Sequence, residues 1–197
     1  MNSIKTLLLF FFICFAKLLM AHPGHDLEPG FTQGLLHPLS GFDHFLVILL
    51  VGFWSVFVLK NLWMGPLAFM VGMIFGVFIG LAAINIEWLE FGISMSVIVI
   101  GILIFLKKKL DLRMSLFLMG IFGTFHGLAH VQYLNFMPSG FIYKSLEDVG
   151  GLLLATFALH LFGAAIAKVS KHRISIISKG AGSITFIYGL ILLLRLI

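Results

Sequence analysis

The sequence predicts an all-α protein: a polytopic bundle of about six transmembrane helices that follows a cleavable signal peptide. Hydrophobic residues make up 60% of the 197 residues and charged residues only 11%, with a mean hydropathy of +1.12. A water-soluble domain of this size must cover its core with polar surface, which this composition does not provide. Several apolar runs also reach the roughly 20 residues that a helix needs to cross a bilayer, and the loops between them are short.

Residues 1–21 have the layout of a secretory signal peptide. A lysine lies near the start (Lys5), an apolar stretch covers residues 7–16, and an alanine precedes a polar break. This order is typical of a cleavable signal, although Lys17 keeps an uncleaved anchor helix as the alternative. The only cysteine, Cys14, lies in this segment, so cleavage leaves a mature chain without disulfides, thiolate metal sites or cysteine nucleophiles.

Residues 22–36 are predicted to form a periplasmic tail. Cleavage after Ala21 leaves His22 at the new N-terminus, close to His25 and Asp26. A terminal amine, two imidazoles and a carboxylate at this spacing are able to hold a divalent metal loosely. The tail is equally well interpreted as a spacer.

Residues 37–197 are predicted to form one transmembrane domain of six helices. The expected spans are about 38–59, 62–84, 88–106, 114–136, 147–167 and 175–197. The last span is the weakest, because Lys179 and Gly180 shorten it from its start. Glycines at three- to four-residue spacing favour close contact between helices. They are Gly72, Gly76, Gly80, Gly120, Gly123 and Gly127.

The distribution of lysine and arginine predicts the orientation in the membrane. Basic residues concentrate in loops on the cytoplasmic side of membrane proteins. With the mature N-terminus in the periplasm, the periplasmic side keeps only Lys144 and Arg195. We therefore predict a multi-pass protein of the bacterial inner membrane, and the net charge of +5 reflects topology, not nucleic-acid binding. The cytoplasmic residues are then Lys60, Lys107, Lys108, Lys109, Arg113, Lys168, Lys171, Arg173 and Lys179.

The first span begins with a polar motif that contains His37, Pro38, Asp43 and His44. Pro38 suits the first turn of a helix, where its missing N–H needs no partner. His37 and His44 are separated by about two turns, or roughly 10 Å, and are expected on one helix face. Ionisable groups next to hydrocarbon usually mark an ion or proton path. The alternative is a helix end whose polar groups are hydrated at the membrane surface.

Later spans carry further histidines. His126 and His130 are four residues apart, a spacing that lets two imidazoles hold one metal. In the fifth span Thr156 precedes His160 by one turn, and it either orients that imidazole or bonds a carbonyl of its own helix. Glu90 lies one turn before Ser94 in the third span.

Depth along the helices predicts that most of these groups gather in the outer half of the membrane, with His160 deeper. Imidazole with a little carboxylate suits nickel, cobalt and zinc better than magnesium or calcium. The predicted metal ligands are His37, Asp43, His44, Glu90, His126, His130 and His160, with His22 and His25 in the tail.

These motifs resemble those of the HupE/UreJ family over essentially the whole chain. The resemblance rests on His37-Pro38-x-x-Gly41-x-Asp43-His44 before Val51-Gly52, on Glu90 before Ser94, Ser96 and Val97, on Phe125-His126-Gly127-x-Ala129-His130, and on Ala155-Thr156-x-x-Leu159-His160-x-x-Gly163. It implies nickel or cobalt uptake across the bacterial inner membrane and partners in hydrogenase or urease maturation, such as metallochaperones. One departure is that Val131-Gln132-Tyr133 follows the second histidine, where the family tends to have Gly-x-Glu.

Transport is the leading hypothesis, with the metal ion as substrate and no enzymatic activity. Two alternatives remain: a zinc-dependent intramembrane hydrolase, and a non-transporting metal sensor or accessory protein. The sequence contains no His-Glu-x-x-His and no Gly-x-Ser-x-Gly motif. It also has no Walker-type phosphate loop, so no ATPase activity is expected.

Overall fold

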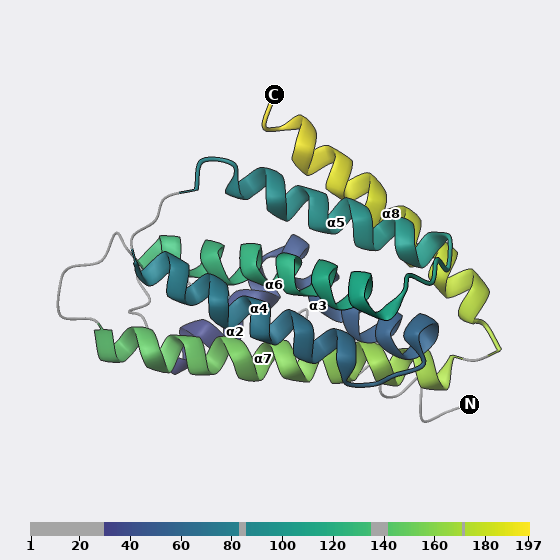
Figure 1. The fold of residues 1–197 in the computed structure, drawn as a ribbon, viewed down its shortest axis with the longest axis horizontal. Helices are drawn as coiled ribbons and strands as arrows, with labels where there is room; N and C mark the ends of the chain where they lie inside the picture. Colours follow the sequence, from purple (N-terminus) through teal and green to yellow (C-terminus); the bar gives the residue numbers. More distant parts are fainter. Residues whose placement is uncertain (1–29, 83–85, 135–141, 171) are drawn as a thin grey trace.

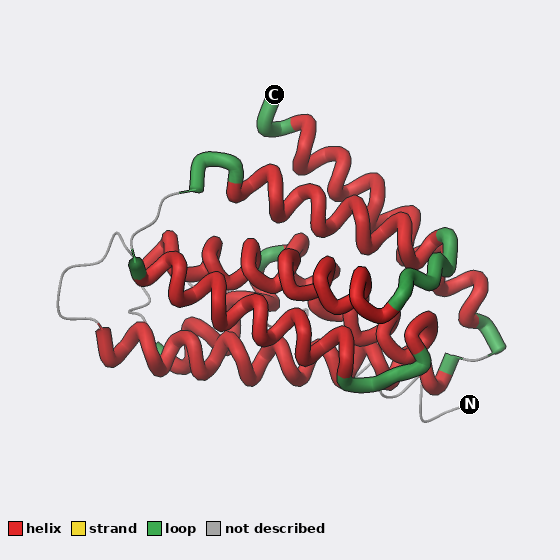
Figure 2. The backbone as a smooth tube through the Cα atoms, in the orientation of Figure 1, coloured by secondary structure: helices red, strands yellow, loops and turns green. Residues whose placement is uncertain are grey.

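The computed structural model describes residues 30–82, 86–134, 142–170 and 172–197. All regular secondary structure in these residues is helical, as Figure 2 shows. The predicted signal peptide and the tail histidines His22 and His25 lie outside the described residues.

Seven α-helices and one π-helical turn make up the described fold. They are α2 (Phe31–Ser40), α3 (Phe42–Trp54), η1 (Ser55–Leu59), α4 (Met64–Leu81), α5 (Leu89–Phe105), α6 (Leu112–Leu134), α7 (Ile142–Val169) and α8 (Ile174–Leu194). Five stretches are long and apolar enough to cross a membrane: Phe42–Leu59, Met64–Leu81, Leu112–Val131, Leu146–Val169 and Ile174–Leu194. The apolar α5 is shorter, with 17 residues. The predicted multi-pass helical class is confirmed.

The start of the predicted first span is wrong. Pro38 lies inside α2, and a new helix begins at Phe42. Pro38 has no N–H to donate to the preceding turn, which weakens the helix around it. Gly41 then adopts an extended conformation, with φ −91° and ψ 114°. His37 and His44 therefore lie on two helices instead of one face of a single helix.

Figure 1 shows that the helices associate in pairs, α4 with α6 and α5 with α8. A Cβ atom on Gly72 or Gly76 would collide with a backbone carbonyl of α6, and one on Gly123 with a backbone carbonyl of α4. Helix α7 packs against both α2 and α3 in the same manner, with Gly52 of α3 against the carbonyl of His160. The predicted role in close packing is confirmed for Gly72, Gly76, Gly80, Gly123 and Gly127, whereas a Cβ atom on Gly120 would lie 3.9 Å from the carbonyl oxygen of Ala68, an ordinary contact.

Helix α3 lies at the centre of the bundle. Val47, Ile48, Val51 and Trp54 on this helix are fully buried, and the helix contacts α4, α5, α7 and α8. An amphipathic surface helix would expose one side, but α3 buries nearly all of its surface against other helices. Side chains at its start are therefore held between several elements at once.

The basic loops meet at one end of the bundle. Trp54 Nε1 donates to the carbonyl of Lys108 at 3.4 Å, and Lys107 Nζ donates to Ser175 Oγ at 2.8 Å. These contacts join the end of α3, the loop between α5 and α6, and the start of α8. The start of α2 and Glu147 near the start of α7 lie at the opposite end, where a Cβ atom on Gly30 would be 3.9 Å from the Glu147 carboxylate.

Candidate functional site: a row of buried imidazoles

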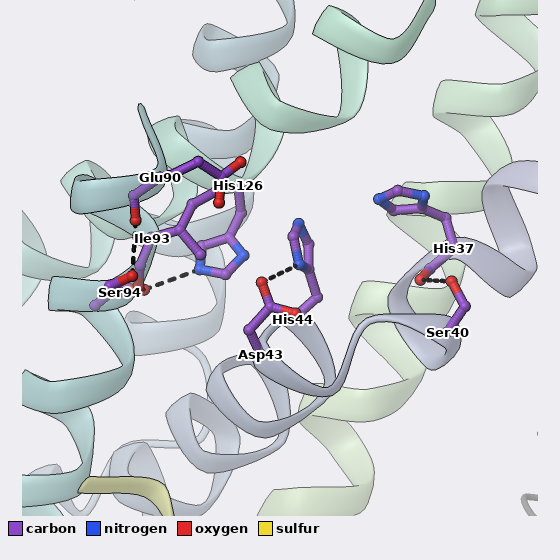
Figure 3. A network of polar contacts seen from close by, with 9 residues as sticks. His37, Ser40, Asp43, His44, Glu90, Ile93, Ser94 and His126 are labelled. Atoms are coloured by element: carbon purple, nitrogen blue, oxygen red, sulfur yellow. Dashed lines mark hydrogen bonds and ion pairs between the residues drawn. The ribbon is translucent and has the colours of Figure 1, made fainter. Parts of the chain in front are cut away.

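Four predicted histidines from three helices lie in a row. The ring centroids of His130 and His37 are 4.4 Å apart, those of His37 and His44 are 5.4 Å apart, and those of His44 and His126 are 4.5 Å apart. Neighbouring rings meet edge to face. Figure 3 shows His126, His44 and His37 following one another, with Asp43 beside His44. The break at Gly41 thus still brings His37 and His44 together, through packing and not through a shared helix face.

Carboxylates hold two of these rings. Asp43 Oδ2 lies 3.0 Å from His44 Nδ1, and Asp148 Oδ2 bonds His130 Nε2. A carboxylate only accepts, so each of these nitrogens carries the proton, and in a neutral imidazole the other nitrogen is bare. Gly41 leaves room for the first pair, because a Cβ atom there would be 3.1 Å from Asp43 Oδ1.

A hydroxyl group holds His126. Ser96 Oγ donates to the carbonyl of Ile93 at 2.7 Å, and it lies 3.0 Å from His126 Nε2. A hydroxyl has one proton to donate, and Ser96 donates it to the carbonyl of Ile93. Ser96 Oγ must therefore accept from Nε2–H of His126. Nδ1 of His126 is then the bare nitrogen.

His160 lies apart from the row, behind an aromatic ring. Its Nδ1 is 2.7 Å from the carbonyl of Ile48 on α3, an acceptor that again leaves the other nitrogen bare. The ring of Phe69 separates His160 from the row, with its centroid 5.3 Å from that of His160 and 5.6 Å from that of His126. Thr156 takes neither role considered for it, since its hydroxyl donates to Met73 Sδ at 3.9 Å.

His44, His126, His130 and His160 share one feature. One ring nitrogen is held by an acceptor, and the other is buried without a hydrogen-bond partner among the described residues. The unpartnered atoms are His44 Nε2, His126 Nδ1, His130 Nδ1 and His160 Nε2. Metal-binding histidines usually present this arrangement, with an outer acceptor that fixes the tautomer and the ring orientation.

The row does not close around one centre. Within the part of the chain that the structure describes, no three histidine, cysteine or acidic side chains form a group that could hold a metal ion. An ion in the row would therefore meet one or two imidazoles at a time. Such sites bind weakly and in succession, which is what passage through a protein requires.

His37, at the junction of α2 and α3, is the least enclosed ring of the row. Burial and the adjacent His130 and His44 imidazoles hold the pKa of His37 well below its usual value. The ring is therefore neutral near pH 7, with a lone pair for a metal.

Known proteins match this chain over the region that contains the row. The family model described as HupE / UreJ protein matches residues 9–192, which contain every residue of the row. The chain belongs to the HupE/UreJ family. It is 32% identical over 175 residues to Protein HupE from Rhizobium leguminosarum bv. viciae, a match that covers 88% of each chain. No solved structure matches this chain.

Glu90 lies outside the row of this HupE/UreJ protein. Its side chain is exposed, and Ser94 Oγ donates to the backbone carbonyl of Glu90 at 2.8 Å, not to its carboxylate. Figure 3 shows Glu90 and Ser94 on the neighbouring helix, beside His126.

Asp148 is the site residue that sequence reasoning missed. Val131-Gln132-Tyr133 follows His130 without an acidic residue, and Asp148 on α7 supplies a carboxylate to this ring. A signal was available, since Asp148, Leu152, Thr156 and His160 recur every four residues and share one buried helix face.

Proposed function

We propose that this protein carries nickel or cobalt ions across the bacterial inner membrane and supplies metalloenzyme maturation. The ion is the substrate, and the chain is not an enzyme. Ions approach from the periplasmic side, bind along His130, His37, His44 and His126, and continue inward past His160. The observation that carries this proposal is that three rings of the row, those of His130, His44 and His126, each have one nitrogen held by the protein and the other unpartnered among the described residues, as does His160.

The chemistry of the row supports nickel or cobalt. Neutral imidazole nitrogens with nearby carboxylates suit divalent nickel, cobalt and zinc, and discriminate against magnesium and calcium. Membership of the HupE/UreJ family favours the first two of these metals. A catalytic zinc site holds its metal with three protein ligands around one centre, whereas no three histidine, cysteine or acidic side chains of the described residues form such a group. Sites made of neighbouring pairs of rings favour passage over hydrolysis.

The position of the basic loops supports the direction of transport. Their shared end carries Lys107 and Lys108, and the positive-inside rule assigns that end to the cytoplasm. The row lies toward the other end, near the start of α7. Ions from the periplasm would then meet His130 and His37 before His126 and His160.

Uptake into proteoliposomes tests the proposal. The purified protein is reconstituted with a metal-sensitive dye inside the vesicles, and Ni(II), Co(II) and Zn(II) are added outside. We expect uptake of nickel or cobalt that falls at least about tenfold in His44→Gln and in His126→Gln, because each loses a ligand nitrogen in the row. His172→Gln changes an exposed histidine outside the row and is the matched control. Binding without uptake by the wild-type protein would contradict transport.

A further inference from the structure

Asp148 is a buried acid whose only ion-pair partner among the described residues is a histidine. Its side chain is 1% exposed, and the neighbouring Glu147 is exposed. The ion pairs of the described residues give Asp148 no lysine or arginine, only His130. A carboxylate in such surroundings is strongly unfavourable unless its contacts compensate. Its presence at this point therefore points to a role in the site.

The contact determines which nitrogen of His130 faces a metal. Asp148 Oδ2 accepts a hydrogen bond from Nε2–H, so Nδ1 carries the lone pair, and the ring centroid of His37 is 4.4 Å from that of His130. Without an acceptor at Nε2, the proton is free to move to Nδ1 and the ring is free to turn. Either change removes a ligand nitrogen from the end of the row.

The backbone of α7 at Asp148 packs against α2, the helix that carries His37. A Cβ atom on Gly34 would collide with the carbonyl of Asp148, so α2 and α7 touch at this point. Gly34 lies three residues before His37, on the neighbouring turn of α2. One helix contact thus fixes the positions of both His37 and the acid that orients His130.

We propose that Asp148 is a positioning residue of the metal path, which holds His130 as the Nε2–H tautomer so that Nδ1 binds the incoming ion. The inference rests on the proposed function, because His130 must meet the metal. Asp148 acts through His130, and its own Oδ1 is buried without a hydrogen-bond partner among the described residues.

The first test reads the tautomer directly, in the absence of metal. The intact protein is labelled with ¹⁵N-histidine, and the His130 signals are assigned by their loss in His130→Gln. We expect the wild-type spectrum to show His130 protonated at Nε2 and bare at Nδ1. A wild-type His130 protonated at Nδ1 would overturn the inference, whether or not the protein transports metal.

The second test measures uptake. Asp148→Leu removes both acceptor oxygens at similar size, Asp148→Glu keeps the carboxylate, and Glu147→Leu makes the same change at the exposed neighbour. We expect Asp148→Leu to raise the KM for Ni(II) about 10–100-fold, as losses of such outer partners do, with a smaller effect on the maximal rate. Asp148→Glu should recover most of the affinity, and Glu147→Leu should match the wild type.

The outcomes separate this inference from the function. A wild-type protein without uptake refutes the transport proposal, while the tautomer of His130 still decides the role of Asp148. An unchanged KM in a folded Asp148→Leu protein overturns the positioning role. If Asp148→Leu does not fold, the wild-type spectrum and the Asp148→Glu variant decide the positioning role. A KM for Asp148→Glu equal to that of the wild type supports the role, and a KM far above it contradicts the role.

Discussion

At the scale of single residues, the buried imidazoles are oriented by three kinds of acceptor. Carboxylates hold His44 and His130, a hydroxyl holds His126, and a backbone carbonyl holds His160. The result is the same in each case, because every acceptor fixes one proton and leaves the other nitrogen bare. The hydroxyl differs from the others because it can be removed without removing a charge or altering the backbone.

Ser96→Ala should therefore weaken metal binding through His126 alone. Without Ser96 Oγ, the His126 Nε2 proton has no acceptor, and the tautomer with a bare Nδ1 is no longer favoured. We expect the Kd for Ni(II), measured by calorimetry on the purified protein, to rise about 10-fold or more.

Ser94→Ala is the matched control for this prediction. Ser94 is also buried on α5, but its hydroxyl bonds only the backbone carbonyl of Glu90, one turn earlier in its own helix. Its loss should leave the Kd within about twofold, since such local bonds contribute little to helix stability. Equal losses of affinity in both variants would show that the effect is structural and not specific to His126.

At the scale of helices, glycines set the distances that bring the row together. Two of the glycines of helix α7 lie in contrasting surroundings. A Cβ atom on Gly163 would collide with the carbonyl of Leu49 on α3, whereas nothing lies within 4 Å of one on Gly150. The contact at Gly163 holds α7 against α3, the same pair of helices that joins His160 to Ile48.

Gly163→Ala should consequently destabilise the protein, and Gly150→Ala should not. An added methyl group against backbone typically costs about 1–3 kcal/mol, whereas alanine in an open helix position gains up to about 1 kcal/mol over glycine. Thermal unfolding in detergent, followed by circular dichroism, measures both. A Gly163→Ala protein that melts at or above the wild-type temperature would contradict the close contact between α3 and α7.

The same scale shows what the sequence could predict. Long apolar runs with glycine spacing were sufficient for the helical class, and the histidine pair at four-residue spacing lies on one helix as expected. The break at Gly41 was not predictable, because Pro38 is compatible with a first turn as well as with the position that it takes inside α2. The acceptors of His126, His130 and His160 come from other helices, and only packing decides them, whereas the acceptor of His44 is its sequence neighbour Asp43.

At the scale of the whole molecule, charge and histidines divide along the bundle. Exposed basic residues such as Lys107 and Lys108 lie at one end, and the contact between Asp148 and His130 lies toward the other. Contact between His126 of the row and His160, which lies apart from the row, is interrupted by the fully buried Phe69. This interruption follows from the fold alone, since nothing in the sequence distinguishes Phe69 from the other phenylalanines of α4.

Phe69 lies between the row and His160, on the route that we propose for the ion. An apolar ring offers an ion no ligand, and apolar constrictions slow conduction by excluding water. Phe69→Leu should therefore raise the maximal rate of Ni(II) uptake about tenfold, equivalent to about 1.4 kcal/mol in the barrier, while the KM set by the row stays the same. Phe75→Leu makes the same change at an exposed position of α4 and should leave both constants unaltered. A slower Phe69→Leu protein with a wild-type melting temperature would contradict the barrier, because it would show that the ring assists passage and does not obstruct it.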